Sequence, residues 1–359
     1  MGHLPIVNQE TILNVIKEGY ISTRGTLKKY IIKTTSDIFS DVLASRKGDL
    51  IFPWIIHGET GENIGFKYVF KIEGPPIFVE GDDYPVKIPL EPEGMEFDNP
   101  LSEAEALDLW DRKLLWNAIG KKSLGRGRSL THQTPMEDAK MLELLNKKNP
   151  EGPKKITLGK EDLQGVQISI NPSQGEWDEE LHSKIKQTPE ENRLSSLNLS
   201  GMQWRRGKYF TVEKTFEAWL MKNIDQESCK ILREMMFDNN ETIEWFGNYL
   251  PFGVQGGNID VVILHSGKSG KTLTVIELKV GSANKSQFES AAEQSIDYSI
   301  FLKKAFNSFD IEVNINSIVL TGKSKQNDSL TPLTRDGLTP KWFTYNITEE
   351  GKVIFERML

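Results

Sequence analysis

The sequence predicts a mixed α and β protein that folds as two domains. Its 359 residues exceed the roughly 100–200 of a typical domain, and hydrophobic residues make up 38% of them, as in other folded globular chains. Segments with the period of a strand and segments with the period of a helix occur in both halves. Between the halves, residues 149–200 hold four prolines and little sustained periodicity. We therefore expect an N-terminal domain at 1–150, a linker with short ordered pieces at 151–204, and a C-terminal domain at 205–359.

Composition and charge argue against several other classes of protein. The chain has no run of about 18 apolar residues that would span a membrane, and the start Met1–Pro5 lacks the basic and apolar regions of a signal peptide. Cys229 is the only cysteine, so an internal disulfide and a cysteine zinc cluster are both excluded. These features predict a cytoplasmic protein without a membrane partner. The net charge of −7 argues against broad, nonspecific coating of nucleic acid.

Strands and helices are both expected in the N-terminal domain. Gly65 to Ile72 places aromatic and apolar side chains at every second position, which is the period of a half-buried strand. Residues 102–115 combine a capping sequence with an apolar stripe of helical spacing. Thr134-Pro135-Met136-Glu137 begins a further helix, because Thr caps well and Pro fits the first turn. Shorter strands are expected at Tyr30–Thr34 and Leu50–Phe52.

A β-hairpin is the central feature predicted in the C-terminal domain. The strands Ile259–Leu264 and Thr272–Val280 are rich in β-branched residues and are joined by a turn of Gly, Ser and Lys. The other elements expected are a helix at Thr211–Asn223, a long helix at Ser286–Phe306, a short buried strand at Ile315–Leu320 and an edge strand at Val353–Phe355.

Three charged residues of this hairpin form the candidate catalytic site. Asp260 lies on the first strand, and Glu277 and Lys279 lie on the second. Since side chains alternate along a strand, Glu277 and Lys279 share one face, while the apolar residues around them suit a core. Charged side chains on an otherwise apolar strand need a reason, because burying unpaired charge is costly. Asp260 is expected to meet Glu277 across the hairpin. The alternative interpretation is a surface salt bridge between Lys279 and a carboxylate.

Two converging carboxylates offer the hard oxygen ligands that Mg²⁺ and Mn²⁺ prefer. A metal held there binds a phosphate oxygen, lowers the pKa of bound water and stabilises a leaving oxyanion. An adjacent ammonium orients the water or offsets charge that develops on the phosphate. We therefore expect Asp260 and Glu277 to bind Mg²⁺ or Mn²⁺ and to act with Lys279 in phosphodiester hydrolysis.

The hairpin resembles the catalytic core of the PD-(D/E)xK nuclease superfamily. Its two segments are Gly257-Asn258-Ile259-Asp260-Val261-Val262 and Thr274-Val275-Ile276-Glu277-Leu278-Lys279-Val280-Gly281. They are similar to the cores of the NucS or EndoMS endonucleases and of RecB-type nuclease domains. Ile259 stands where the proline of the superfamily's name precedes the aspartate. The resemblance covers roughly residues 210–305 and implies a restriction-endonuclease-like mixed sheet flanked by helices.

The same resemblance extends to two helices. The segment from Gln294 to Tyr298 matches the family's Gln-x-x-x-Tyr pattern on the helix after the hairpin. The resemblance therefore implies that Gln294 and Tyr298 lie beside the metal site. The helix that begins at Glu213 resembles the family's opening helix, where an acidic residue reaches the active site. Glu217 is the first candidate for that residue and Glu213 the second; a solvated helix residue is the alternative.

The N-terminal domain resembles the PUA-like group, which includes EVE and YTH modules. The matching segments are 36–39 before 46–52, then 65–72, and a late helix that starts with 134–139. The resemblance implies a small β-barrel with helices that reads a modified base in an aromatic pocket. Trp54 is singled out because it follows Pro53 at a strand end; the other candidate walls are Phe52, Tyr68, Trp110 and Trp116. The alternative is that these aromatic residues form the core.

Basic residues gather in two places. Residues 59–111 hold 14 acidic and three basic side chains, whereas residues 112–128 hold six basic side chains and no acidic one. The last four of the six basic residues lie among glycines, and a glycine lets a phosphate approach the backbone closely. The candidate nucleic-acid-binding residues are Lys121, Lys122, Arg126 and Arg128, with Arg205 and Arg206 as a second group. Ordinary surface loops are the alternative for both groups.

Together these features predict a metal-dependent DNA endonuclease whose N-terminal domain selects the target, as in modification-dependent restriction or defence. A structure- or mismatch-specific repair endonuclease of the NucS type is a second hypothesis. A catalytically inactive nucleic-acid-binding protein is a third, from another class. DNA is the expected partner. A homodimer is expected where both strands are cut, because many double-strand cutters pair two active sites.

Overall fold

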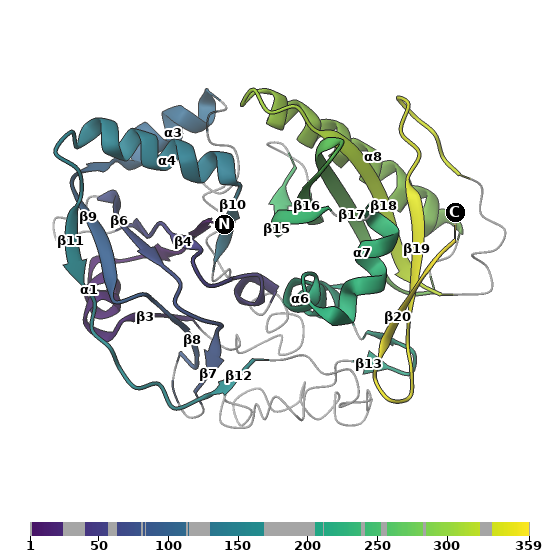
Figure 1. Cartoon of the computed structure of the whole chain (residues 1–359), viewed down its shortest axis with the longest axis horizontal. Coiled ribbons are helices and arrows are strands. Elements are labelled where there is room, and N and C mark those ends of the chain that lie inside the picture. The colour runs from purple at the N-terminus through teal and green to yellow at the C-terminus, as the bar shows by residue number, and fades with distance from the viewer. Residues whose placement is uncertain are drawn as a thin grey trace. The chain divides into compact units, whose positions relative to one another are not determined.

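The chain divides into two compact units. The computed structural model describes residues 2–23, 40–56, 63–79, 82, 84–112, 114, 130–168, 205–210, 212–237, 241–252, 257–282, 285–323 and 332–358. The first unit comprises Met1–Leu27 with Asp41–Ile168, and the second comprises Lys28–Ser40 with Ser169–Leu359 (Figure 1). Both units contain helices and strands, which confirms the predicted mixed α and β class.

Two sheets build the described part of the first unit. Their strands are β1 (Gly2–Leu4), β2 (Ile6–Val7), β3 (Tyr20–Thr23), β4 (Leu50–Ile51), β5 (Trp54–Ile55), β6 (Gly65–Lys71), β7 (Ile77–Phe78), β8 (Val86–Pro89), β9 (Glu93–Leu101), β10 (Thr131–Gln133), β11 (Lys154–Thr157) and β12 (Val166–Gln167). The larger sheet has the order β10-β1-β4-β6-β5-β2, with β9 and β11 attached through β6, and it curls into a half-barrel. The smaller has the order β12-β7-β8-β3.

Local sequence signals explain where the helices of this unit begin and end. The helices are α1 (Gln9–Glu18), α3 (Glu103–Asp111) and α4 (Pro135–Lys148). Thr134 and Glu137 form a capping box at the start of α4, in which each side chain bonds the other residue's backbone amide. Asn8 caps α1, and Gly19 ends it with a φ of 80°, a conformation that favours glycine.

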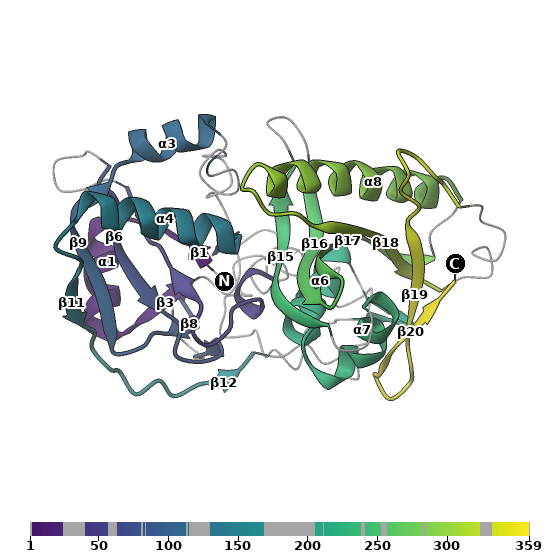
Figure 2. The same ribbon diagram turned by 45° about the horizontal axis from the view of Figure 1, so that its top comes forward.

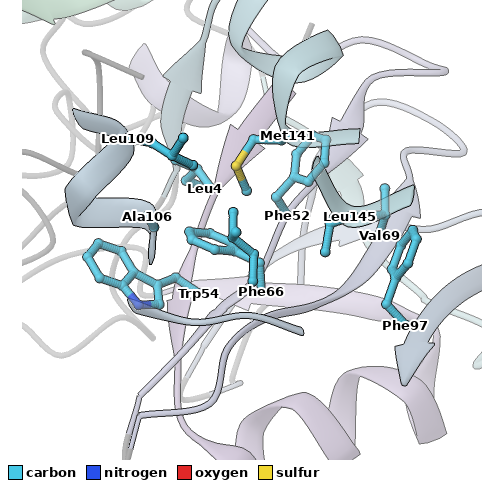
Figure 3. Packing of buried hydrophobic residues seen from close by; sticks show 11 residues of the cluster. Leu4, Phe52, Trp54, Phe66, Val69, Phe97, Ala106, Leu109, Met141 and Leu145 are labelled. Atoms are coloured by element: carbon cyan, nitrogen blue, oxygen red, sulfur yellow. The ribbon is translucent and has the colours of Figure 1, made fainter. Parts of the chain in front are cut away.

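The core of the first unit lies between the curled sheet and the helices α3 and α4. Its residues are Leu4, Phe52, Trp54, Phe66, Val69, Phe97, Leu101, Ala106, Leu109, Met141 and Leu145 (Figure 3). Trp54 is 3% exposed and packs on Phe66, with ring centroids 5.7 Å apart. Phe52 and Tyr68 are buried as well. A ring that stacks on a base must offer a face to it, so the structure favours the core interpretation for these three residues.

The first unit continues beyond residue 150, where the sequence placed its end. β11 pairs with β9 from Lys154 to Thr157, and β12 pairs with β7. These ladder hydrogen bonds make residues 151–168 part of the first unit rather than of a linker. The remainder of the predicted linker, 169–204, lies outside the described residues.

A six-stranded sheet forms the centre of the second unit. Its strands are β15 (Thr242–Pro251), β16 (Asn258–Gly267), β17 (Gly270–Ser282), β18 (Asn314–Gly322), β19 (Lys341–Ile347) and β20 (Val353–Arg357), in that order. The pairs β17–β18 and β18–β19 are parallel, and the other three pairs are antiparallel. A two-stranded ribbon of β13 (Arg205–Arg206) and β14 (Tyr209–Phe210) is separate from this sheet.

Helices cover both faces of this sheet. They are α6 (Glu213–Asn223), the short η3 (Glu227–Cys229), α7 (Lys230–Met236) and α8 (Lys285–Asn307). On one face, α8 packs Phe288 against Trp342 of β19, with ring centroids 3.6 Å apart. On the other, α6 packs Phe216 against Tyr345, three residues further along the same strand. The helices α8 and α6 lie on opposite sides of the strands (Figure 2). The sheet is therefore a buried, rigid layer.

Most elements predicted from the sequence are confirmed. The hairpin is β16 and β17, the long helix is α8, and β20 pairs with β19 alone among the described strands, which makes it an edge. The predicted strand Tyr30–Thr34 and the segment 36–39 lie outside the described residues. The sequence did not predict β9, β15 or β19. No described helix is long and apolar enough to cross a membrane. The PUA-like and nuclease-like folds stay predictions.

Replacement of Trp54 by Ala should destabilise the protein by about 3–5 kcal/mol, because it empties a large volume in the core. Differential scanning calorimetry measures the loss. Trp54→Phe should cost clearly less, since it keeps an aromatic ring and removes the buried Nε1 donor, which lacks a partner in the described structure. Leu13→Ala, at a site 54% exposed, is the control with little expected change. Weakened DNA binding at an unchanged melting temperature would instead make Trp54 a base-stacking residue.

Candidate metal and catalytic site

Asp260 and Glu277 lie opposite each other on neighbouring strands. The ladder between β16 and β17 pairs Val261 with Ile276, and the same register continued by one position sets Asp260 against Glu277. Both are buried, with 7% of Asp260 and 4% of Glu277 exposed. Asp260 Oδ2 accepts a hydrogen bond of 2.9 Å from the backbone amide of Leu278. The hairpin thus brings the two predicted carboxylates together.

A β-bulge begins directly after Leu278, one residue past Glu277. Leu278 pairs with Leu320 of β18, but the next paired residue is Ser282 with Gly322, so β17 advances four residues while β18 advances two. Gly281 has a φ of 71° within this bulge, a backbone conformation that favours glycine. Bulges re-aim side chains and occur often beside active sites. Lys279 lies in this bulge, and its Nζ is 2.6 Å from Glu277 Oε1 and 2.8 Å from the Leu278 carbonyl oxygen.

Helix α6 contributes two further carboxylates, and they differ in their surroundings. Glu217 is fully buried: Lys214 forms an ion pair with its Oε2, and Asn248 of β15 donates to its Oε1. Glu213 is 35% exposed, and its Oε2 lies 3.6 Å from Lys279 Nζ. The sequence favoured Glu217 as the acidic residue that reaches the site. The structure brings Glu213 to Lys279 and holds Glu217 between its own partners.

Tyr298 approaches the carboxylates from helix α8. Burial and the negative charges of Glu277 and Asp260 raise the pKa of Tyr298 to about 12, so the phenol keeps its proton at neutral pH. The ring is 7% exposed and packs on Phe252, with centroids 4.8 Å apart. Gln294 lies one helical turn earlier and is exposed. Of the predicted pair, Tyr298 is the residue whose pKa responds to the charges of Glu277 and Asp260.

The cluster carries more negative than positive charge. Its four carboxylates are Glu213, Glu217, Asp260 and Glu277, and its two ammonium groups are those of Lys214 and Lys279. Two negative charges remain in excess when every group is ionised. Such an excess in a buried place is costly unless a proton or a cation compensates it.

The pKa shifts follow from this imbalance. Burial, and then the neighbouring charge of Glu277, raise the pKa of Asp260 well above that of a free aspartate. Burial also raises the pKa of Glu277, although Lys279 opposes the shift. For Lys279, burial by itself would lower the pKa, but the charges of Glu277 and Glu213 outweigh it and raise the pKa. Lys279 therefore stays protonated, while the carboxylate pair resists full ionisation.

A divalent cation fits this donor set. Glu277 Oε2 is buried and has no hydrogen-bond partner in the described part of the chain. Two ionised carboxylates cannot hydrogen-bond each other, so the pair needs a shared proton or a cation. Among the described residues, no group of three or more His, Cys, Asp or Glu side chains is arranged to hold a metal ion. Two carboxylates suit Mg²⁺, which usually keeps several waters and takes few protein ligands.

Of the basic residues predicted to bind nucleic acid, the structure describes the side chain of Arg205. Lys121, Lys122, Arg126 and Arg128 lie outside the described residues, as does the side chain of Arg206. Arg205 donates to the carbonyl oxygens of Thr348 and Glu349, at 2.8 and 3.5 Å. Part of its guanidinium is therefore committed to the loop between β19 and β20. Arg112, at the start of the basic segment, pairs with Asp108 at the surface, as the solvated interpretation predicts for that residue.

Comparisons with protein-family models, with curated proteins and with solved structures find no match to this chain. The chemistry of the site therefore rests on its own residues.

Sequence reasoning missed three residues of the site. Lys214 precedes Glu217 by three positions, the spacing of a helical ion pair, and this signal was present. Asn248 is an amide on a buried strand that was not predicted. Tyr249 has a φ of 55°, uncommon for an aromatic residue, and covers Lys214 with its ring at 4.2 Å from Nζ. Backbone conformation of this kind has no signature in a single sequence.

Asp260→Asn should stabilise the metal-free protein at neutral pH by about 1–3 kcal/mol, because it removes a buried charge and supplies an amide donor to Glu277. Since the folded-state pKa of Asp260 is raised, the folded chain binds more protons than the unfolded chain. The stability of the wild type should therefore fall as pH rises from about 3.9, the pKa of an unfolded aspartate. Urea titrations at several pH values check this: the advantage of the variant should grow with pH. A variant that loses stability relative to the wild type as pH rises would mean that the ionised carboxylate stabilises the fold.

Proposed function

We propose that the second unit is a metal-dependent endodeoxyribonuclease that hydrolyses phosphodiester bonds with Mg²⁺ or Mn²⁺. One observation carries the proposal: two buried carboxylates face each other, one of them with an oxygen that has no partner among the described residues, directly beside a protonated lysine. A purely structural ion pair needs one carboxylate for one ammonium. The second carboxylate adds a cost that a metal ligand explains.

Asp260 and Glu277 would hold the metal, since they are the buried pair of hard oxygen ligands. When bound, the metal supplies Lewis-acid activation of water and neutralisation of phosphate charge. The two strands keep the carboxylates in place, because β16 and β17 are paired from the turn up to Val261 and Ile276, the residues next to Asp260 and Glu277, and both strands are buried there. The backbone amide of Leu278 fixes one oxygen of Asp260, which leaves the other oxygen of that carboxylate for the ligand role.

Three further side chains would act on the phosphate and the water. The Lys279 ammonium is a charged donor next to Glu277, suited to orient the attacking water or to offset negative charge in the transition state. Tyr298 keeps its proton and can donate to a phosphate oxygen. Glu213 is half-exposed beside Lys279 and is the carboxylate best placed to accept a proton from water that enters from solvent.

Target selection would belong to the first unit, which is expected to recognise a modified base, as in modification-dependent restriction. Recognition of mismatched or branched DNA, as in a repair endonuclease of the NucS type, is the alternative. The basic segment 112–128 would supply phosphate contacts on an otherwise acidic chain. A homodimer would set two sites on opposite strands.

Asp260→Ala and Glu277→Ala should each reduce DNA cleavage at least about 100-fold, because each deletes a metal ligand. The assay is gel-based cleavage of plain, modified, mismatched and branched DNA, with RNA as a further substrate, in Mg²⁺ and in Mn²⁺. Excess chelator should stop the wild type. Glu234→Gln, an exposed carboxylate of α7, is the matched control and should keep wild-type activity. Cutting that survives in chelator, or in both alanine variants, contradicts the metal mechanism.

Joint substitution of Lys121, Lys122, Arg126 and Arg128 by Ala should weaken DNA binding and flatten its dependence on salt. Each lost phosphate contact reduces the slope of log affinity against log salt by about 0.9 for duplex DNA. Fluorescence anisotropy at salt concentrations between roughly 50 and 200 mM measures both the affinity for DNA and its dependence on salt. An unchanged slope would show that this segment is an ordinary surface loop.

A further inference from the structure

Lys279 turns back into the site instead of reaching into solvent. A lysine on a partly exposed strand usually extends its ammonium into water. Here the side chain is 26% exposed, and Nζ approaches three oxygens: Glu277 Oε1 at 2.6 Å, the Leu278 carbonyl at 2.8 Å and Glu213 Oε2 at 3.6 Å. The first two contacts are hydrogen bonds, and the third is an ion pair, so the ammonium is held by Glu277 and the Leu278 carbonyl and drawn toward Glu213.

Two of these oxygens are also suited to a metal. Glu277 is one of the two proposed ligands, and a backbone carbonyl is a hard oxygen donor. An ammonium and a divalent cation compete for one carboxylate oxygen, because their like charges repel each other at such short range. The uncompensated oxygen, Glu277 Oε2, belongs to the same carboxylate.

From this geometry we infer that the Lys279 ammonium is an internal counter-cation that occupies the cation position of the metal-free site and competes with the divalent metal for Glu277. The inference rests on the proposed metal site. Metal binding at Glu277 Oε1 and the Leu278 carbonyl then requires Lys279 to leave both oxygens. The released ammonium becomes available to an anionic ligand such as a phosphate group. Metal binding and presentation of the lysine to the substrate are therefore coupled.

Lys214 provides a matched control for this inference. It is the other ammonium of the same cluster and is similarly enclosed, with 13% of its side chain exposed. Its ion pair is with Glu217, and it lies over the Tyr249 ring. Removal of either lysine deletes one positive charge near Asp260 and Glu277. Both variants should therefore gain affinity for Mn²⁺ through the same kind of long-range electrostatic effect. Only removal of Lys279 vacates oxygens of the proposed metal site.

The test is titration of Mn²⁺ into the full-length protein by isothermal calorimetry at one pH, with wild type, Lys279→Met and Lys214→Met. Lys279→Met should bind Mn²⁺ at least tenfold more tightly than the wild type, and its gain should exceed that of Lys214→Met. Its melting temperature without metal should fall below that of the wild type, and added Mn²⁺ should close the gap. Lys279→Gln keeps a hydrogen-bond donor without the charge and should also bind Mn²⁺ more tightly than the wild type and Lys214→Met. It replaces Lys279→Met in the comparison if the methionine variant fails to fold.

Equal or weaker Mn²⁺ binding by both Lys279 variants would overturn the inference, and so would a gain no larger than that of Lys214→Met, since long-range charge would then explain it. In either case Mn²⁺ binding by the wild type leaves the proposed metal site standing. If neither the wild type nor any variant binds Mn²⁺, the proposed function fails together with the inference.

Discussion

The second unit is organised around the cost of burying two carboxylates side by side. Asp260 and Glu277 face each other on adjacent strands with almost no exposure, and like charges at such a distance raise the free energy of the folded chain when both are ionised. The surrounding residues reduce this cost without removing it. The Leu278 amide donates to Asp260, the Lys279 ammonium pairs with Glu277, and Lys214 adds a second positive charge. A cation between the carboxylates would compensate what remains.

The sheet is irregular beside these charges, and a further register shift lies between Ile243 and Trp245 of β15. The ladder between β16 and β17 is continuous from Val261 to Gly267, but β17 bulges directly after Leu278. On the other side of β16, Tyr249 adopts a positive φ at the position that faces Asp260 in the register of β15. Irregular backbone of this kind is tolerated when a rigid layer surrounds it, and it is found often at functional sites. Helices on both faces of the sheet provide that rigidity.

Strand periodicity was sufficient to predict the hairpin and the meeting of Asp260 with Glu277, because both depend on alternation and on a short turn. It was not sufficient to predict the path of Lys279, which depends on a bulge, or the choice between Glu213 and Glu217. Those two glutamates share a helical face, and only the packing of α6 decides which one lies near Lys279. Trp54 shows the same limit in the first unit: a tryptophan after a proline suits a binding pocket or a core equally well, and burial decided between them. β11 lay in a stretch without periodicity, and its pairing with β9 is a long-range contact.

The central claim is that Asp260 and Glu277 hold a divalent metal. Anomalous diffraction from crystals of the full-length protein soaked in Mn²⁺ tests it most directly, since the signal locates the ion without reference to activity. We predict one anomalous peak within bonding distance of both carboxylates, with the Lys279 ammonium displaced from Glu277. A Mn²⁺ soak that leaves no peak between these carboxylates, with Lys279 still bonded to Glu277, would contradict the account.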